Sequence, residues 1–246
     1  MTYLKRISFN WKDANNLCSY PFNIPTLRSI DSIDITNNIT FFVGENGSGK
    51  STLLESIAYK AGFALKGGGR NAILHSDLDD LSLESIITLS WLPKITNGFF
   101  LRAETLFNYE EYLEELANQP FVNRRDVYAS YGGKELFAQS HGESFMSLFE
   151  HRFRQKGLYI LDEPEAALSP QRQLAFLKIL KDQVAENNSQ FIIATHSPII
   201  LSYPNAVIYS FDDGNIKQVN YEDTEHFQLT KDFLNNRERY FKYLFE

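Results

Sequence analysis

The chain has 246 residues, of which 43% are hydrophobic, and a formal net charge of −7 at pH 7. This composition suits one substantial hydrophobic core, and no apolar stretch approaches the roughly 20 residues of a membrane span. The single cysteine, Cys18, excludes an internal disulfide, so we expect a cytoplasmic protein with no direct membrane insertion. The acidic balance disfavours non-specific binding of nucleic acid without removing nucleic acid from the list of partners.

The first part of the chain predicts a β-rich entry to the core. Residues 3–11 alternate well enough for a strand, and another short strand is expected around residues 33–35. Residues 39–43 are β-branched and aromatic, which predicts a buried strand. Residues 51–58 then carry apolar side chains at helical spacing.

Between this strand and this helix, residues 44–51 match the phosphate-binding pattern G-x-x-x-x-G-K-[ST] in full. The glycines let backbone N–H groups turn toward phosphate oxygens, and the helix N-terminus adds partial positive charge. We expect Lys50 to reach the outer phosphates and the Ser51 hydroxyl to ligate Mg²⁺. Because no Asn-Lys-x-Asp segment is present, ATP is favoured over GTP. The residues expected at the nucleotide are Gly44, Asn46, Gly47, Ser48, Gly49, Lys50, Ser51 and Thr52.

The middle of the chain predicts a small, mainly helical insert over residues 61–137. Residues 85–91 and 99–101, separated by a turn that contains Gly98, predict a β-hairpin whose turn favours positive φ. Residues 109–117 predict an amphipathic helix. The insert is too short for a long coiled-coil arm.

From residue 157 onward, strands and helices alternate. Residues 158–161, 191–195 and 206–211 predict strands, and residues 171–184 predict a helix. Such alternation is typical of a parallel sheet. We therefore expect one α/β domain over residues 1–246, with a parallel core sheet and an antiparallel, β-rich N-terminal part.

Two carboxylates follow the strand over residues 158–161. Hydrolysis of a phosphoanhydride needs a carboxylate that holds the metal and a second group that orients or deprotonates the attacking water. Adjacent side chains on an extended chain point to opposite sides. This predicts that Asp162 approaches Mg²⁺ while Glu163 faces the water.

The ordered motifs resemble those of ABC-class P-loop ATPases. The segment from Ser140 to Ser144 resembles the ABC signature motif. The segment from Thr195 to Pro198 resembles the switch-histidine segment of the branch that contains chromosome-maintenance, RecF-like and OLD-like ATPases. The resemblance implies an ABC-type ATPase core of this non-transporter branch, similar to bacterial AAA/ABC-like ATPases.

The resemblance also implies roles for single residues. It places His196 at the γ-phosphate, Glu163 as the general base, and Asp162 with Ser51 around Mg²⁺. Lys50 completes the catalytic set.

The signature residues carry a further implication. In ABC-class ATPases this motif completes the site of the opposite subunit, so Ser140, Gly142 and Glu143 would contact the nucleotide of a partner copy. One signature per chain implies a homodimer that sandwiches ATP.

Two further functional positions each have more than one candidate residue. An aromatic ring upstream of the glycine loop often stacks on adenine in this class, and Tyr20 and Phe22 are the candidates, with core packing as the alternative for either. The glutamine expected after residues 99–101 is absent, and Arg102 or Glu104 takes its place.

The leading hypothesis is an Mg²⁺-dependent ATPase whose homodimer regulates or drives a protein partner. DNA repair, phage defence and toxin–antitoxin assemblies are outputs suggested by analogy alone. Two alternatives stay open: the ATPase subunit of an ABC transporter, and an ATP-gated DNA-binding clamp with little turnover.

Overall fold

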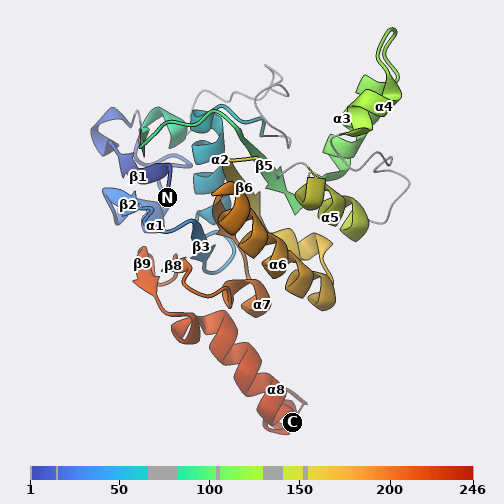
Figure 1. Cartoon of the computed structure of the whole chain (residues 1–246). Helices are drawn as coiled ribbons and strands as arrows, with labels where there is room; N and C mark the ends of the chain where they lie inside the picture. The colour runs from blue at the N-terminus through green and yellow to red at the C-terminus, as the bar shows by residue number, and fades with distance from the viewer. Residues whose placement is uncertain are drawn as a thin grey trace.

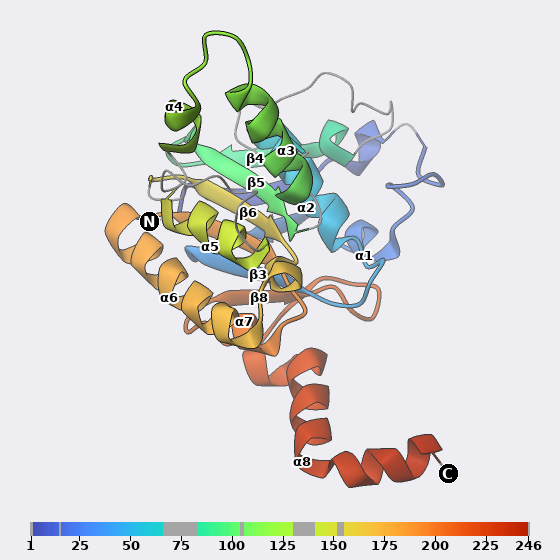
Figure 2. The same cartoon turned by 90° about the vertical axis from the view of Figure 1, so that its right-hand side faces the viewer.

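The computed structural model describes residues 2–14, 16–65, 83–103, 106–129, 141–151 and 155–245. At its centre is a six-stranded sheet, which lies between helices in Figures 1 and 2. Its strands are β3 (Ile39–Val43), β5 (Gly98–Arg102), β6 (Leu158–Asp162), β7 (Gln190–Ala194), β8 (Val207–Ser210) and β9 (Lys217–Val219). They are ordered β5-β6-β7-β3-β8-β9, and all neighbouring pairs are parallel except β8 with β9. This confirms the expected parallel α/β core.

A second sheet is antiparallel and lies at the N-terminal part of the chain. Its strands, in the order β2-β1-β4, are β1 (Leu4–Phe9), β2 (Ser32–Asp34) and β4 (Ile87–Trp91). The predicted β-rich N-terminal part is therefore confirmed. The predicted hairpin is wrong, because β4 pairs with β1 in this sheet while β5 pairs with β6 in the other.

Gly98 has a different role from the one its sequence context predicts. It is the first residue of β5, and it is absent from the described glycines with positive φ. A Cβ at this position would lie 2.1 Å from the carbonyl oxygen of Leu158 and 2.3 Å from the Phe63 ring. Glycine is needed here for the close approach of neighbouring backbone, not for a turn.

Helices cover both faces of the six-stranded sheet (Figure 2). On one face, α2 (Lys50–Ala61) and the antiparallel sheet pack over a core that includes Phe42 and Ile160. On the other face, α5 (His141–His151) and α6 (Pro170–Asn187) cover a core that includes Phe41 and Leu161. Successive strand residues point to opposite faces, so one apolar strand supplies both cores.

The remaining helices lie around this body. They are α1 (Pro25–Arg28), α3 (Leu106–Ala117), α4 (Arg124–Ala129), α7 (Pro198–Leu201) and α8 (Glu225–Phe245). In both views α3 and α4 lie toward one end of the molecule, and α8, in red, extends from the opposite end (Figures 1 and 2). The division into one domain with an insert over residues 61–137 stays a prediction.

Helix α8 has no buried residue and changes direction at Asn236, where φ is −132° and ψ is 32°. It exposes large apolar side chains, among them Leu234 and Tyr243. Even so, across the described ranges no helix combines the length and apolarity that crossing a bilayer demands.

A buried side chain, Gln190 at the start of β7, forms hydrogen bonds between the two sheets. Its Oε1 accepts hydrogen bonds from the backbone N–H groups of Tyr3 and Leu4 at 3.0 and 2.9 Å, and its Nε2 donates to the Leu4 carbonyl at 2.9 Å. All three bonds are shielded from water, because Gln190 is fully buried. The amide thereby extends the hydrogen bonding of β1 to the central sheet.

Candidate active site

The central residues of the predicted site lie at the carboxyl ends of neighbouring parallel strands. The glycine loop follows β3, Asp162 ends β6, and Thr195 follows β7, which lies between β6 and β3. Chain segments far apart in sequence therefore meet at one edge of the sheet. This edge is where open α/β sheets bind their ligands.

The glycine loop has the backbone conformation that its sequence predicts. Gly47 has φ +81° and Gly49 has φ +100°, both in the region that disfavours residues with a Cβ. A Cβ on Gly49 would also lie 3.0 Å from Ile24, whereas in front of Gly47 there is open space. The loop is thus packed on its inner side and open at its tip, where an anion can approach the backbone N–H groups.

Lys50 begins α2 and is held over the loop. Its Nζ donates to the carbonyl oxygens of Gly44 and Glu45 at 2.6 and 2.8 Å. Burial lowers the pKa of Lys50, and the nearby carboxylates of Glu163 and Asp162 oppose that shift. To bind a phosphate, the ammonium exchanges these carbonyl acceptors for phosphate oxygens.

Ser51 and Asp162 are brought together as the sequence predicts. The Ser51 hydroxyl donates to Asp162 Oδ1 at 3.2 Å, and the Asp162 side chain is only 2% exposed. A hydroxyl and a carboxylate are oxygen ligands, which Mg²⁺ prefers. The described His, Cys, Asp and Glu side chains form no cluster of three that could hold a metal alone. Mg²⁺ commonly takes one or two protein ligands and completes its shell with water and phosphate oxygens, so Ser51 and Asp162 are the residues that would hold it.

Arg102 ends β5 and lies opposite Asp162 in the parallel register. Its Nε donates to Asp162 Oδ2 at 2.8 Å, and its Nη1 is 2.8 Å from Glu55 Oε1. Of the two residues considered for the position of the missing glutamine, Arg102 thus contacts the site, while Glu104 lies outside the described residues.

Glu163 adopts a conformation that the sequence does not predict. With φ 50° and ψ 53° it is left-handed, so the expectation of extended backbone through Glu163 is wrong. Its N–H donates to the Ala194 carbonyl at 2.9 Å, and the chain turns at once into the short 3-10 helix over Pro164–Ala167. Non-glycine residues held in this region cost about 1–3 kcal/mol and concentrate at functional sites.

His196 follows β7 and faces Glu163. Its Nε2 lies 3.5 Å from Glu163 Oε1, and its Nδ1 lies 2.8 Å from Nε2 of His226. Burial first, then the charges of Lys50 and His226, lower the pKa of His196 to about 4. The imidazole is therefore neutral at pH 7.

Sequence reasoning missed two residues that shape the switch segment. Glu165 accepts a hydrogen bond from Thr195 Oγ1 at 2.7 Å and another from the backbone N–H of His196. Burial raises the pKa of Glu165, and these two donors oppose the shift. Its position directly after Asp162, Glu163 and Pro164 could have indicated that Glu165 belongs to the site. His226 lies 30 residues beyond His196, and no local pattern marks it.

The signature residues lie apart from this cluster. Ser140 lies outside the described residues. Gly142 and Glu143 begin α5, where Glu143 forms an ion pair with Arg172 of α6 at 3.6 Å. A Cβ on Gly142 would lie 2.0 Å from Arg172 Nη1 and 3.0 Å from the Ala167 carbonyl oxygen, so glycine leaves room for the Arg172 guanidinium. Their role toward a partner subunit stays a prediction.

The two aromatic candidates differ in exposure. Phe22 is 1% exposed and packs in the core with α2, so its ring offers no face to a base and this assignment is corrected. Tyr20 is 65% exposed, and its hydroxyl lies 3.0 Å from Thr52 Oγ1, next to the glycine loop. Tyr20 stays the candidate for stacking on adenine.

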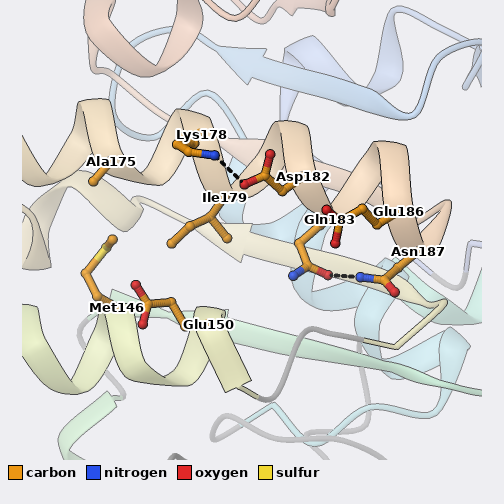
Figure 3. A pocket seen from close by; sticks show the side chains of 9 residues that line it. All are labelled: Met146, Glu150, Ala175, Lys178, Ile179, Asp182, Gln183, Glu186 and Asn187. Atoms are coloured by element: carbon orange, nitrogen blue, oxygen red, sulfur yellow. Dashed lines mark hydrogen bonds and ion pairs between the residues drawn. The ribbon is translucent and has the colours of Figure 1, made fainter.

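A groove of about 630 Å³ lies elsewhere, between α5 and α6 (Figure 3). Met146 and Glu150 of α5 face the α6 side chains across it, and Lys178 pairs with Asp182 at 2.8 Å along its wall. It extends to Asn187 at the end of α6, close in sequence to the start of β7. None of the predicted site residues that the structure describes lines this groove.

Comparisons with known proteins bear on the class of protein to which the chain is similar. A family described as "AAA domain, putative AbiEii toxin, Type IV TA system" matches residues 150–202, which include Asp162, Glu163 and His196. The tungstate uptake system ATP-binding protein TupC of Campylobacter jejuni is 26% identical over 224 residues, covering 80% of this chain and 65% of TupC. Protein ea59 of Escherichia phage lambda is 47% identical over 130 residues, covering 49% of this chain and 24% of ea59. The chain spans less than two thirds of either relative.

Solved structures agree on the fold. An SmcHead bound to the C-terminal winged-helix domain of ScpA matches with a TM-score of 0.51 and 13% identity, over 89% of this chain and 98% of that one. At this identity the likeness speaks for the fold alone. Together, the comparisons are consistent with a P-loop ATPase of the SMC, RecF and ABC class.

Proposed function

Because the chain has the fold and the ordered motifs of ABC- and SMC-class P-loop ATPases, we propose that it binds ATP with Mg²⁺, hydrolyses it and acts as an ATP-sandwiched homodimer. The proposal depends chiefly on one observation: Lys50, the Ser51–Asp162 pair, Glu163 and His196 meet at one edge of the sheet. Turnover would regulate or drive a protein partner in the cytoplasm.

Each side chain has a task suited to its chemistry. Lys50 exchanges its carbonyl acceptors for phosphate oxygens, and Ser51 with Asp162 would hold Mg²⁺, which supplies charge neutralisation on the phosphates. The Glu163 carboxylate accepts a proton from the attacking water. Neutral His196 donates from Nε2 to the γ-phosphate, whose oxygens are hydrogen-bond acceptors.

The dimer is supported by the signature segment. Gly142 lies in the first turn of α5, at a helix N-terminus whose partial positive charge suits an anion. Figure 2 shows α5 on the same side of the sheet as α6, with the glycine loop entering α2 on the other side. If a second copy completes the site, the signature residues of one chain need not lie near its own glycine loop.

The test combines two variants with one matched control. Lys50→Ala is expected to weaken ATP binding at least tenfold, whereas Lys60→Ala, at the exposed end of the same helix, leaves it unchanged. Glu163→Gln is expected to retain ATP but lose about 10²–10⁴-fold in turnover, the range for general-base catalysis. Equal turnover in wild type and Glu163→Gln would remove Glu163 from this role.

Sedimentation tests the dimer separately. With saturating ATP and Mg²⁺, Glu163→Gln is expected to sediment as a dimer, because bound ATP is not consumed. A monomer under these conditions would contradict the sandwich while leaving ATP binding intact.

A transporter subunit is the second candidate, favoured by the similarity to TupC. Arg102 in place of the usual glutamine and the Thr195–Pro198 segment count against it. Co-purification with a membrane protein would support it. Turnover that is low alone but stimulated by duplex DNA would instead favour the DNA clamp.

A further inference from the structure

Helix α8 reaches the active site through its first turn. His226, the second residue of α8, places its Nε2 2.8 Å from Nδ1 of His196, with the two rings 4.9 Å apart and inclined at 51°. Both rings are partly buried, and burial lowers the pKa of each. Two neutral imidazoles at this distance share one proton, so one ring donates and the other accepts.

The surroundings of His196 decide which ring is the donor. Nε2 of His196 faces the Glu163 carboxylate at 3.5 Å, and among the described residues neither this atom nor Nδ1 of His226 has a hydrogen-bond partner. A carboxylate or a phosphate only accepts, so the proton of His196 belongs on Nε2. Nδ1 of His196 then carries no proton, and Nε2 of His226 must donate a hydrogen bond to it.

The residues just before α8 are hydrogen-bonded to the segment that carries His196. The Tyr221 hydroxyl donates to the Pro198 carbonyl at 2.9 Å, and Thr224, which is buried, donates through its hydroxyl to the Tyr221 carbonyl at 2.7 Å. From there α8 extends away from the body, with its later turns exposed (Figure 2). The first turn of α8, which carries His226, is therefore held beside His196.

We propose that His226 is a positioning residue that holds His196 in the Nε2–H tautomer, aimed at the γ-phosphate, and that this pairing thereby supports hydrolysis. This inference rests on the proposed function for its kinetic consequence. The tautomer itself is a property of the folded chain without nucleotide.

The tautomer is measured first, by ¹⁵N NMR of the imidazole nitrogens in full-length, nucleotide-free protein. Wild type is expected to show His196 with Nε2 protonated and Nδ1 bare. In His226→Leu the donor is lost, and a mixture of tautomers is expected. His226→Gln, whose side-chain amide can donate, is expected to restore the wild-type pattern.

Kinetics test the consequence. His226→Leu is expected to lower kcat at least tenfold with little change in KM, and His226→Gln to recover most of that loss. Leu229→Gln, one turn along α8 at an exposed position, serves as the control and should leave both constants unchanged. If the tautomer changes in His226→Leu alone, a general loss of folding cannot be the cause.

The outcomes separate the two proposals. Identical His196 signals in wild type and His226→Leu would overturn the positioning role, whatever the turnover. A shifted tautomer with unchanged kcat would overturn the role of the pairing in hydrolysis. Absence of ATP turnover in wild type, together with a shifted tautomer, would reject the proposed function and leave the pairing of His226 with His196 standing.

Discussion

Arg102 donates through Nε to the buried carboxylate of Asp162 at 2.8 Å, across the parallel pairing of β5 with β6. A second contact, from Nη1 to Glu55 at 2.8 Å, fixes the guanidinium between two carboxylates. The residue proposed to hold Mg²⁺ is thus neutralised by a cation from the neighbouring strand.

Replacing Arg102 by leucine should therefore destabilise the protein. The change leaves the charge of Asp162 buried without a partner, and such losses amount to about 3–5 kcal/mol. Millimolar Mg²⁺ should restore part of the loss, because it supplies a replacement cation. The measurement is the free energy of unfolding in urea, with and without Mg²⁺.

Arg6→Leu is the matched control. Arg6 pairs with Asp34 at 2.6 Å, but both side chains are about half exposed, and exposed pairs contribute about 0–1 kcal/mol. Equal losses in the two variants, or no response of Arg102→Leu to Mg²⁺, would contradict the role given to the Arg102–Asp162 pair.

Gln190→Leu should weaken the attachment of the antiparallel sheet to the central one, which the shared core around Phe42 and Ile160 still holds. The variant removes three buried hydrogen bonds and leaves the N–H groups of Tyr3 and Leu4 unpaired, a loss of about 2–4 kcal/mol in the free energy of unfolding. Gln218→Leu on the exposed edge strand β9 should change it by less than about 0.5 kcal/mol. Hydrogen exchange of the Leu4 amide would report the same event locally, and an unchanged rate there would argue against the link.

Gly98→Ala should be poorly tolerated because of space, not backbone conformation. The added Cβ would lie 2.1 Å from the Leu158 carbonyl, so the strands must move apart, at a loss of about 3 kcal/mol or more. Gly214→Ala is the comparison: there φ is +71° and the space is open, which costs about 1–2 kcal/mol of strain. If thermal unfolding ranks Gly214→Ala as the more damaging change, the close-approach explanation fails.

The partly buried imidazole of His196 should make stability depend on pH. His196 has a folded-state pKa of about 4, against about 6.5 for an unfolded histidine. Between these values the unfolded chain binds a proton that the folded chain does not, so stability is full above pH 6.5 and falls as the pH drops toward 4. Urea unfolding at pH 7.0, 5.5 and 4.5 should show a shallower fall for His196→Gln than for wild type. Parallel curves would show that His196 does not titrate as described.

The sequence by itself determined the elements and motifs that depend on neighbours along the chain. The strand over residues 39–43, the glycine loop and the helix that became Pro170–Asn187 were predictable, because periodicity and glycine spacing are local properties. The alternation of strands and helices also determined the parallel sheet. The meeting of Ser51 with Asp162 was implied by the resemblance to ABC-class ATPases, which places both residues around Mg²⁺.

Only the tertiary structure decided which distant groups touch. The pairing of β4 with β1, the bonds of Gln190 and the contact of His226 with His196 join residues that are 30 or more positions apart, with the strands and side chains free to choose other partners. The same holds for the left-handed backbone of Glu163, which local preference disfavours. Packing of the whole chain selects these contacts, since their free energies depend on burial and on partners that no local pattern specifies.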